Sequence, residues 1–316
     1  MPELPEVTTT VNGLQKVLPG LCFVDIWQDI SKKNQTIKQF KYTFKDEKFF
    51  NKARKEIIGK KVINVQRRAK NILINISGGY TILIHLKMTG HLLFGKYKKI
   101  VSSKQKGKRE IRWVPENDGP LNDPSNRFIH VVFSLSNGKY LAFCDSRKFG
   151  KITLIDTKNI AESIHLSKIG PEPLDKKFTL KNFKEQLFIK PNGKIKTILM
   201  DQSIIAGIGN IYSDEMLWSS SINPESTPLK IPKDRLVKLY QEMKKVLSMG
   251  INFGGDSMSD YRNIDGLRGN FQHHHNVYQK KGEACGKKGC FGVIIRKVIN
   301  GRSSHFCNSH QKLYGR

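Results

Sequence analysis

Four potential metal ligands near the end of the chain constrain its fold more than any other sequence feature. They are, in chain order, Cys285, Cys290, Cys307 and His310, with four, sixteen and two residues between successive members. The segment between the two pairs contains a strand-like run that ends at Asn300-Gly301, a typical hairpin turn. Three thiolates and one imidazole in paired knuckles around a hairpin fit a tetrahedral site. The sequence therefore predicts one structural Zn²⁺ and no catalytic metal.

Other histidines and cysteines offer alternatives to this ligand set. His305 is an alternative fourth ligand, although the two-residue spacing after Cys307 favours His310. The adjacent residues His273 to His275 do not easily converge on one ion, so we expect them at a loop surface. Cys22 and Cys144 lie in apolar segments and are expected to be buried, small apolar side chains.

The charge of the chain indicates a polyanionic partner. Its 316 residues suffice for two or three domains, and 55 Lys and Arg against 27 Asp and Glu give a net charge of +28. Such an excess favours nucleic acid, because neutralised phosphates release their counterions. A lysine-rich proteome is the alternative explanation. No window holds the roughly 18 apolar residues of a membrane helix, and no signal-peptide pattern is present. We therefore expect a cytoplasmic protein without a disulfide framework.

The chain begins with Met1-Pro2-Glu3-Leu4-Pro5-Glu6. Proline in second position favours removal of Met1, which would leave the secondary amine of Pro2 as the chain terminus. An α-amino group has a pKa of about 8, against about 10.4 for lysine, so more of it is an unprotonated nucleophile near neutral pH. Such amines form Schiff bases with carbonyl carbons. Glu3 adds a general acid or base. The alternative is an ordinary helix entry.

The spacing of apolar residues predicts a helical start followed by a β-rich region. Apolar residues recur at helical spacing from Val7 to Leu18, and Pro19-Gly20 stops the run. From Leu21 to about Ile155 short strand-like runs alternate with turns, notably at Ser77-Gly78-Gly79 and Ser136-Asn137-Gly138. We expect an antiparallel sandwich or barrel here.

Two basic stretches interrupt the strands, and the second half of the chain is helical. Residues Ser31 to Lys61 are lysine-rich, and Tyr97 to Asn126 reads as a solvated basic loop that either contacts nucleic acid or only covers the surface. Helical periodicity extends from Thr179 to about Met249. Within it, Gly207-Ile208-Gly209-Asn210 is either a phosphate-binding helix start or a simple connector. The polar, glycine-rich segment from Gly254 to Phe271 is expected to be functional or disordered.

Taken together, the motifs resemble the formamidopyrimidine-DNA glycosylase branch of the family shared with endonuclease VIII. The resemblance covers nearly the whole chain. It rests on the stretches Met1 to Val7, Arg67 to Lys70, His85 to Gly90, Asp145 to Gly150, Gly170 to Leu174, Ile195 to Glu215 and Cys285 to Gln311.

The resemblance implies an α+β multidomain fold. Residues 2–155 would form the N-terminal helix and an antiparallel β-sandwich, and residues 156–178 a hinge. Residues 179–280 would form a helical domain with a helix-two-turn-helix motif and a lesion-recognition loop at 254–271. Residues 281–316 would form the zinc β-hairpin.

The resemblance also implies the chemistry. The amine of Pro2 would attack C1′ of the damaged nucleotide, expel the base and form a Schiff base, and β- and δ-elimination would then cut the strand. Glu3 would protonate the sugar ring oxygen. Lys70 completes the catalytic set, at a phosphate near the lesion.

A second group of residues would bind the DNA around the extruded nucleotide. Glu6 would hold the damaged base, Lys196 would lie near the damaged base and phosphate, and His85 would be a further phosphate contact. Met88, Arg147 and Phe149 would fill the hole in the stack; without the resemblance, Met88 and Phe149 would be assigned to the core. The phosphate clamps would be Asn210 and Arg302.

The chain departs from the family pattern at several points. The first zinc knuckle is longer than usual, and His310 replaces a cysteine, though such a set still binds zinc. Ser259 stands where some relatives carry lysine, and Lys148 replaces an arginine. Glu215 matches a structural or active-site-supporting carboxylate and is left out of the catalytic set. The basic stretch 97–126 has no assigned role.

We therefore expect a monomeric base excision repair enzyme acting on duplex DNA with oxidised purines or abasic sites. It would be a glycosylase and abasic-site lyase holding one Zn²⁺, located in the cytoplasm at the nucleoid of a prokaryote. The alternatives are an endonuclease VIII-like enzyme for oxidised pyrimidines and a non-catalytic lesion-binding protein.

Overall fold

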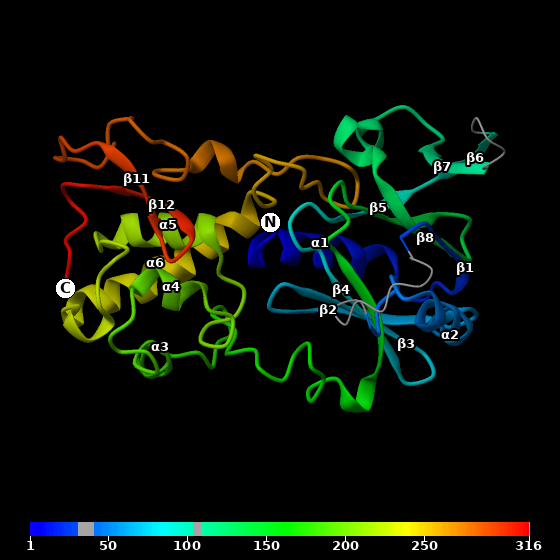
Figure 1. Cartoon of the computed structure of the whole chain (residues 1–316), viewed down its shortest axis with the longest axis horizontal. Coiled ribbons are helices and arrows are strands. Elements are labelled where there is room, and N and C mark those ends of the chain that lie inside the picture. The colour runs from blue at the N-terminus through cyan, green and yellow to red at the C-terminus, as the bar shows by residue number, and fades with distance from the viewer. Residues whose placement is uncertain (31–40, 104–108, 316) are drawn as a thin grey trace. The chain divides into compact units, whose positions relative to one another are not determined.

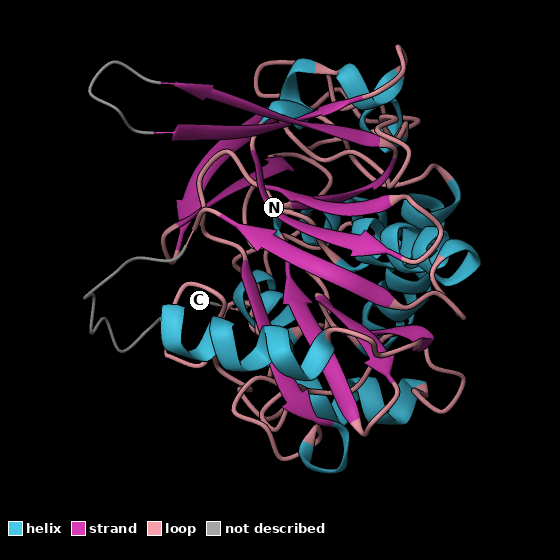
Figure 2. Ribbon diagram, turned by 90° about the vertical axis from the view of Figure 1, so that its right-hand side faces the viewer, coloured by secondary structure: helices cyan, strands magenta, loops and turns pink. Residues whose placement is uncertain are grey.

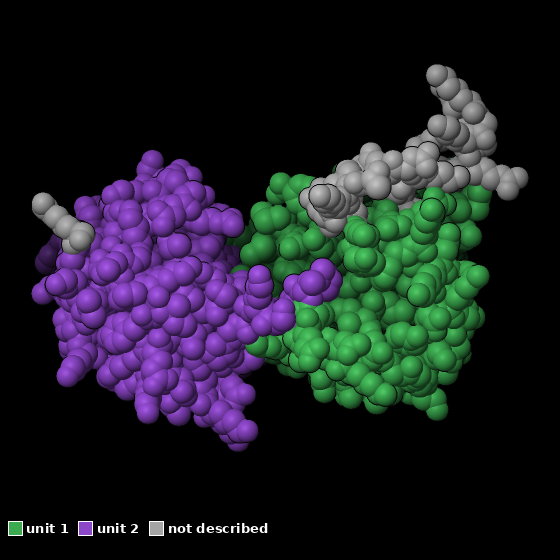
Figure 3. Space-filling model, turned by 60° about the horizontal axis from the view of Figure 1, so that its bottom comes forward, with its two compact units in different colours: residues 1–2, 6–163, 254–270 green, residues 3–5, 164–253, 271–316 purple. Residues whose placement is uncertain are grey.

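The structure is a computed structural model that describes residues 1–30, 41–103 and 109–315. The chain divides into two compact units (Figure 3). Unit 1 comprises residues 1–2, 6–163 and 254–270, and unit 2 comprises residues 3–5, 164–253 and 271–316. The loop 254–270 thus groups with the strands of unit 1, whereas the sequence-based division placed it with the helices. The predicted domain boundaries stay a prediction. In the described part of the chain, no helix has the length and apolar character needed to cross a membrane.

Unit 1 is a sandwich of two antiparallel sheets, as expected from the sequence (Figure 1). The sheet orders are β1-β8-β9-β5 and β10-β4-β3-β2. The elements, in chain order, are α1 (Leu4–Val17, of which Leu4 and Pro5 belong to unit 2), β1 (Phe23–Gln28), α2 (Glu47–Ile57), β2 (Val62–Arg68), β3 (Asn71–Ile76), β4 (Tyr80–His85), β5 (His91–Gly95), β6 (Tyr97–Ser103), β7 (Arg109–Pro115), η2 (Pro120–Asn122), η3 (Pro124–Arg127), β8 (Ile129–Leu135), β9 (Tyr140–Cys144), β10 (Lys151–Asp156) and η4 (Thr157–Asn159).

The core of unit 1 follows from the alternation of side chains along the strands. Ile72 and Ile74 of one sheet and Val131 and Phe133 of the other are buried in one apolar cluster. Each such side chain contributes about 1.5–3 kcal/mol on burial. The helical stripe predicted from the sequence joins this cluster, since Val7, Val11, Leu14 and Leu18 are all buried in it. Both predicted turns join antiparallel neighbours, β3 with β4 and β8 with β9.

The helix α2 was not expected from its lysine-rich sequence. It begins after Asp46, whose side chain accepts a hydrogen bond from the backbone N–H of Phe49 at 3.2 Å. Phe50, Ala53 and Ile57 are buried on one face of this helix. A few apolar residues at helical spacing are enough to give this helix a buried face, although many of its other residues are charged. Residues 31–40 of the same stretch lie outside the described residues.

The prediction of a solvated loop at residues 97–126 was wrong. The stretch forms the β6–β7 hairpin and two short helices, η2 and η3. Figure 2 shows the hairpin at the edge of its unit. Trp113 of β7 packs on Trp27 and Tyr140, with ring centroids 6.0 and 5.1 Å apart. Residues 104–108, with three of the lysines, lie outside the described part of the chain.

Unit 2 contains the expected helices and the zinc-type hairpin. Its elements are α3 (Leu180–Leu187), α4 (Ile195–Met200), α5 (Asn210–Ser220), η5 (Pro228–Lys230), α6 (Lys233–Asn252), η6 (Phe271–His274), β11 (Ile294–Ile299) and β12 (Arg302–Cys307). The α5 and α6 helices pack through Tyr212, Met216 and Met243, which are buried in a second core. Asn300 and Gly301 turn the hairpin with φ of 45° and 75°, as the Asn-Gly pair predicts.

Two minor expectations were wrong in part. Cys144 is buried as predicted, but Cys22 is only half-buried. His273 and His274 are exposed, whereas His275 is 5% exposed and has Phe271 and Tyr278 as edge-on aromatic neighbours. Aromatic packing thus buries one imidazole of a run that the sequence placed entirely at the surface.

Candidate functional site

Glu3 lies at the N-terminal end of α5 in unit 2. Its Oε1 accepts a hydrogen bond from the backbone N–H of Ile211 at 3.0 Å, and the residue is 2% exposed. The backbone N–H of Leu4 donates to the carbonyl of Gly207 at 3.0 Å. A Cβ on Gly209 would lie 2.3 Å from Cδ of Glu3. The glycine turn therefore holds a carboxylate of the chain itself at a helix end that favours negative charge.

Lys196, predicted to lie near base or phosphate, is buried in an ion pair. Its Nζ lies 2.6 Å from Oδ1 of Asp214 and donates to the carbonyl of Ser303 at 2.9 Å. Burial lowers the pKa of Lys196, and Asp214 opposes part of that shift. Asp214 also accepts the backbone N–H of His305 at 2.9 Å. This network joins α4, α5 and β12.

The structure brings Glu3, Lys196, Asn210 and Arg302 together within unit 2. Glu3 and Arg302 are both close enough to Lys196 to influence its pKa, which Glu3 raises and Arg302 lowers. Lys196 and Arg302 line one cavity of about 260 Å³ between α4 and the hairpin. Asn210 is the first residue of α5, next to Ile211. Arg302 is exposed at the hairpin turn, where the resemblance places a phosphate clamp.

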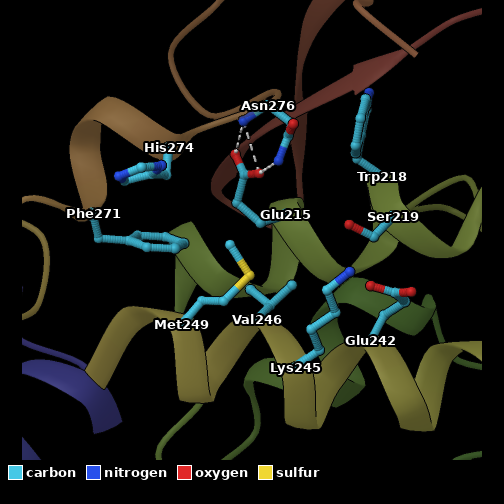
Figure 4. Close-up of a pocket in the computed structure, with 10 residues that line it drawn as sticks. All are labelled: Glu215, Trp218, Ser219, Glu242, Lys245, Val246, Met249, Phe271, His274 and Asn276. Carbon is cyan, nitrogen blue, oxygen red and sulfur yellow. Dashed lines mark hydrogen bonds between the residues drawn. The ribbon is translucent and has the colours of Figure 1, made fainter. Parts of the chain in front are cut away.

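Glu215 connects α5 to the chain segment that precedes the zinc-type hairpin. Its buried carboxylate accepts backbone N–H groups of Asn276, Val277 and Tyr278 at 2.9–3.1 Å. Figure 4 shows the Glu215 carboxylate turned toward Asn276, beside a cavity of about 250 Å³. These bonds give the carboxylate a structural role, which agrees with leaving it out of the catalytic set.

Glu6 is buried in unit 1 against the segment predicted to recognise the lesion. Its Oε1 accepts the backbone N–H of Asp256 at 2.8 Å, and its carbonyl accepts the hydroxyl of Tyr261 at 3.0 Å. Gly255 has φ of 87°, and a Cβ there would lie 2.9 Å from Cγ of Glu6. The loop therefore approaches Glu6 as closely as a glycine backbone permits.

A basic cluster surrounds His85 in unit 1. Burial, followed by the charges of Lys87, Lys70 and Lys151, lowers the pKa of His85 to about 3. Its Nδ1 accepts the backbone N–H of Lys87 at 3.0 Å, so the ring is neutral and its Nε2 carries the proton. An N–H donor among three lysines suits a phosphate oxygen. Lys70 follows Ala69, which turns β2 into β3 with φ of 53°.

Met88, Arg147 and Phe149 are exposed, so they are not core residues. Met88 is 38% and Phe149 49% exposed, and the Arg147 guanidinium lies 4.7 Å from the Phe149 ring centroid. The two segments that carry these side chains are joined, because Thr89 donates to Asp145 and accepts the backbone N–H of Arg147 at 3.2 Å.

The predicted metal ligands converge. One ligand atom from each of Cys285, Cys290, Cys307 and His310 lies within 4.8 Å of all the others. Nδ1 of His310 faces Sγ of Cys285 at 3.1 Å, and its Nε2 lies 3.1 Å from the carbonyl of Trp218. Such a second contact orients a ligating imidazole. The alternative ligand His305 instead contacts Asp214. The cluster has the donor set to bind a metal ion.

The sequence reasoning missed residues that support the site. Asp214, Asp145 and Arg262 form the buried polar contacts that hold predicted site residues or the loop beside Glu6. Asp214 and Asp145 lie inside recognised motifs, but a lone sequence shows no partner for either. Arg262 carries no motif signal at all.

Comparisons with known proteins match the chain over nearly its whole length. Residues 1–152 match the family model described as formamidopyrimidine-DNA glycosylase N-terminal domain, and residues 169–262 match the formamidopyrimidine-DNA glycosylase H2TH domain. Formamidopyrimidine-DNA glycosylase of Pelotomaculum thermopropionicum is 35% identical, over 99% of this chain and 100% of the relative. That of Desulforamulus reducens is 34% identical, over 99% of both chains.

Solved structures give the same assignment. A complex of Lactococcus lactis Fpg with DNA containing an abasic site matches with a TM-score of 0.78 and 29% identity, over 98% of this chain and 99% of the other. A complex of the wild-type Lactococcus lactis protein with DNA containing N7-benzyl-Fapy-dG matches with a TM-score of 0.77 and 29% identity, over 98% and 100%. The fold is that of a glycosylase with an H2TH domain. The chain belongs to the formamidopyrimidine-DNA glycosylase family.

Proposed function

We propose that this protein excises oxidised purines from duplex DNA and cuts the resulting abasic strand through the amine of Pro2. The observation that carries the proposal is the buried Glu3 carboxylate, held at α5 directly beside Pro2 in the chain. A pure DNA-binding protein has no need for an acid fixed next to a potential amine nucleophile. The proposal requires that Met1, which is 39% exposed, be removed.

In the proposed reaction the Pro2 amine attacks C1′ and the base leaves with the bonding electrons. The Glu3 carboxylate takes up the proton that the amine loses on attack and passes it to the ring oxygen, which opens the sugar and leaves a Schiff base on Pro2. Loss of a proton from C2′ then expels the 3′ phosphate, and loss of a proton from C4′ expels the 5′ phosphate, which cuts the strand. Water hydrolyses the remaining Schiff base and frees the Pro2 amine. The cluster around His85 would bind phosphate, and Met88, Arg147 and Phe149 would fill the space of the extruded nucleotide.

The metal is proposed to be Zn²⁺ in a structural role. Three thiolates, which are soft donors, together with an imidazole form a ligand set that suits Zn²⁺. The Trp218 carbonyl, 3.1 Å from Nε2 of His310, would orient the ring. When bound, the ion would fix the hairpin that carries Arg302, which supports DNA binding and not the chemistry.

Borohydride trapping tests the enzymatic proposal. The purified protein is incubated with duplex DNA holding 8-oxoguanine opposite cytosine, and a covalent complex is expected. The complex should disappear when Met1 is retained, because the nitrogen of Pro2 is then part of an amide, and it should decrease in Pro2→Gly, which replaces the secondary amine with a primary one. Pro5→Gly, which leaves the Pro2 amine in place, should still be trapped. Absence of both trapping and strand cutting on 8-oxoguanine, formamidopyrimidine and abasic DNA would leave only a DNA-binding protein. Preferred trapping on 5,6-dihydrouracil would favour the endonuclease VIII-like alternative.

A further inference from the structure

The segment that follows the β6–β7 hairpin packs directly on the loop 254–270, within unit 1. Gly266 has φ of 83°, and a Cβ on it would lie 2.6 Å from the carbonyl oxygen of Pro120. Only glycine permits this approach. The basic stretch 97–126, which had no assigned role, therefore ends in a contact with the proposed lesion-recognition loop.

Arg262 is the centre of that contact. It is 1% exposed, and its guanidinium makes five hydrogen bonds, one for each of its N–H donors. Nε and Nη2 donate to the two carboxylate oxygens of Asp123 at 3.0 and 3.1 Å. The others go to Ser125 Oγ and to the carbonyls of Ser259 and Tyr261, at 2.8–3.2 Å. A lysine cannot reproduce this planar, two-pronged geometry.

The short segment that carries Asp123 is held against β5. Asp123 accepts the backbone N–H of Ser125 at 2.8 Å, which starts η3. Asn126 in the same short helix is 3% exposed, and its Oδ1 lies 2.9 Å from Nε2 of His91 in β5. Asp123 is thus presented from a part of the fold that does not depend on the loop.

Residues next to Arg262 in the chain contact Glu6 and the segment that carries Arg147. Tyr261, adjacent to Arg262, donates its hydroxyl to the Glu6 carbonyl at 3.0 Å. Ser146, adjacent to Arg147, donates to Asp260 at 3.1 Å. A shift of Arg262 would therefore move Tyr261, whose hydroxyl contacts Glu6, and Asp260, whose carboxylate contacts Ser146 beside Arg147.

We propose that the Asp123–Arg262 pair is a positioning element that holds residues 256–262 in the shape that receives the damaged base. This inference rests on the proposed function. If the pair positions the loop that holds the damaged base, base excision should depend on the pair, because excision needs a correctly held base. Cleavage at a ready-made abasic site has no base to hold, so it should not depend on it.

The test compares these two reactions in Asp123→Asn and Arg262→Lys under single-turnover conditions. Excision of 8-oxoguanine is expected to fall at least about tenfold, since small misplacements have large kinetic costs. Abasic-site cleavage should stay within about twofold of the unmodified protein. The double variant should lose little more than either single variant, because both remove the same contact. Ser125→Ala, which removes one acceptor of Arg262, provides a milder variant if the others fold poorly.

The control is Asp25→Asn, which breaks the solvent-exposed Arg54–Asp25 pair of the same unit and should change neither reaction. Unchanged excision in Asp123→Asn, or equal loss of both reactions, would overturn the inference. Hydrogen exchange separates it from the proposed function, because it needs no activity. If the unmodified protein is inactive, the function fails. In that case, the claim that the pair holds residues 256–262 in place survives only if the backbone amides of these residues exchange faster in Asp123→Asn than in Asp25→Asn.

Discussion

The carboxylate of Glu3 and the backbone N–H of Ile211 form a 3.0 Å hydrogen bond at the start of α5. Glu3 and Ile211, which are 208 positions apart in sequence, thus meet at the N-terminal end of α5, directly after the glycine-containing turn. From the sequence, that turn was either a phosphate site or a connector. In the structure it orients the carboxylate of Glu3, the residue after Pro2, because Gly209 has no side chain of its own in the space that this carboxylate fills.

Gly209→Ala should therefore impair the chemistry by displacing Glu3. A Cβ would lie 2.3 Å from Cδ of Glu3, so the carboxylate must move. We expect excision to fall about 100-fold, as for other misplaced catalytic groups. Gly193→Ala is the matched control, since its Cβ would meet only the side-chain end of Ile198 at 3.1 Å and the carbonyl of Lys190 at 3.4 Å. Equal rates in both variants, measured by single-turnover assay, would contradict a role for this turn.

Asp214→Asn should strongly destabilise unit 2. Both Asp214 and Lys196 are 1% exposed, so the change leaves a buried ammonium without its counter-charge. Breaking such a pair costs about 3–5 kcal/mol. The free energy of unfolding from urea titration measures the loss. Arg235→Gln breaks the solvent-exposed pair with Asp234 in the same unit and should cost no more than about 0.5 kcal/mol. Comparable losses in the two variants would show that burial of Lys196 is not decisive.

Stability should decrease below pH 6.5 through His85. Its folded-state pKa of about 3 lies below the ordinary value of 6.5, so the unfolded chain takes up the proton first. The contribution is complete above pH 6.5 and is lost as the pH falls toward 3. The slope should be at most about 1 kcal/mol per pH unit, because the side chain is half-buried. His85→Gln should flatten this slope in urea titrations from pH 7 to 4.5, and an unchanged slope would assign the effect to other groups.

Phe149→Ala should reduce excision without reducing stability. The side chain is 49% exposed, so its removal should change the free energy of unfolding by no more than about 0.5 kcal/mol. If it fills the stack, excision should fall about tenfold or more. Ile63→Ala removes a 57% exposed side chain from the same unit and should leave excision unchanged. A large loss of stability in Phe149→Ala would show instead that this side chain packs in the core of the protein.

Removal of His310 should abolish metal binding, and removal of His305 should not. Nδ1 of His310 lies with the three thiols, whereas His305 contacts Asp214. Elemental analysis should find about one zinc per chain in His305→Ala and in the unmodified protein, and much less in His310→Ala. A strong chelator should also lower DNA affinity by releasing the hairpin that carries Arg302. Full zinc content in His310→Ala would make the fourth ligand a different residue.

Local sequence patterns predicted a large part of the fold. The stripe from Val7 to Leu18, the Asn-Gly turns and the cysteine spacing each depend on residues close in sequence, and each was confirmed. The sequence did not predict the helix α2 or the β6–β7 hairpin, because the few apolar residues in these stretches lie among many lysines. Trp113 of this hairpin packs on Trp27 and Tyr140, which are distant in sequence, so this packing could not be predicted from the local pattern.

The sequence by itself determined the family motifs, the metal ligands and the candidate nucleophile at Pro2, since these depend on residue types and spacing. Tertiary structure alone decided that Glu3 is held by α5, that Lys196 is paired with Asp214, and that Asp123 reaches Arg262. The physical reason is that buried polar groups must find partners when the chain folds. Those partners lie far apart in sequence, so no local pattern records them.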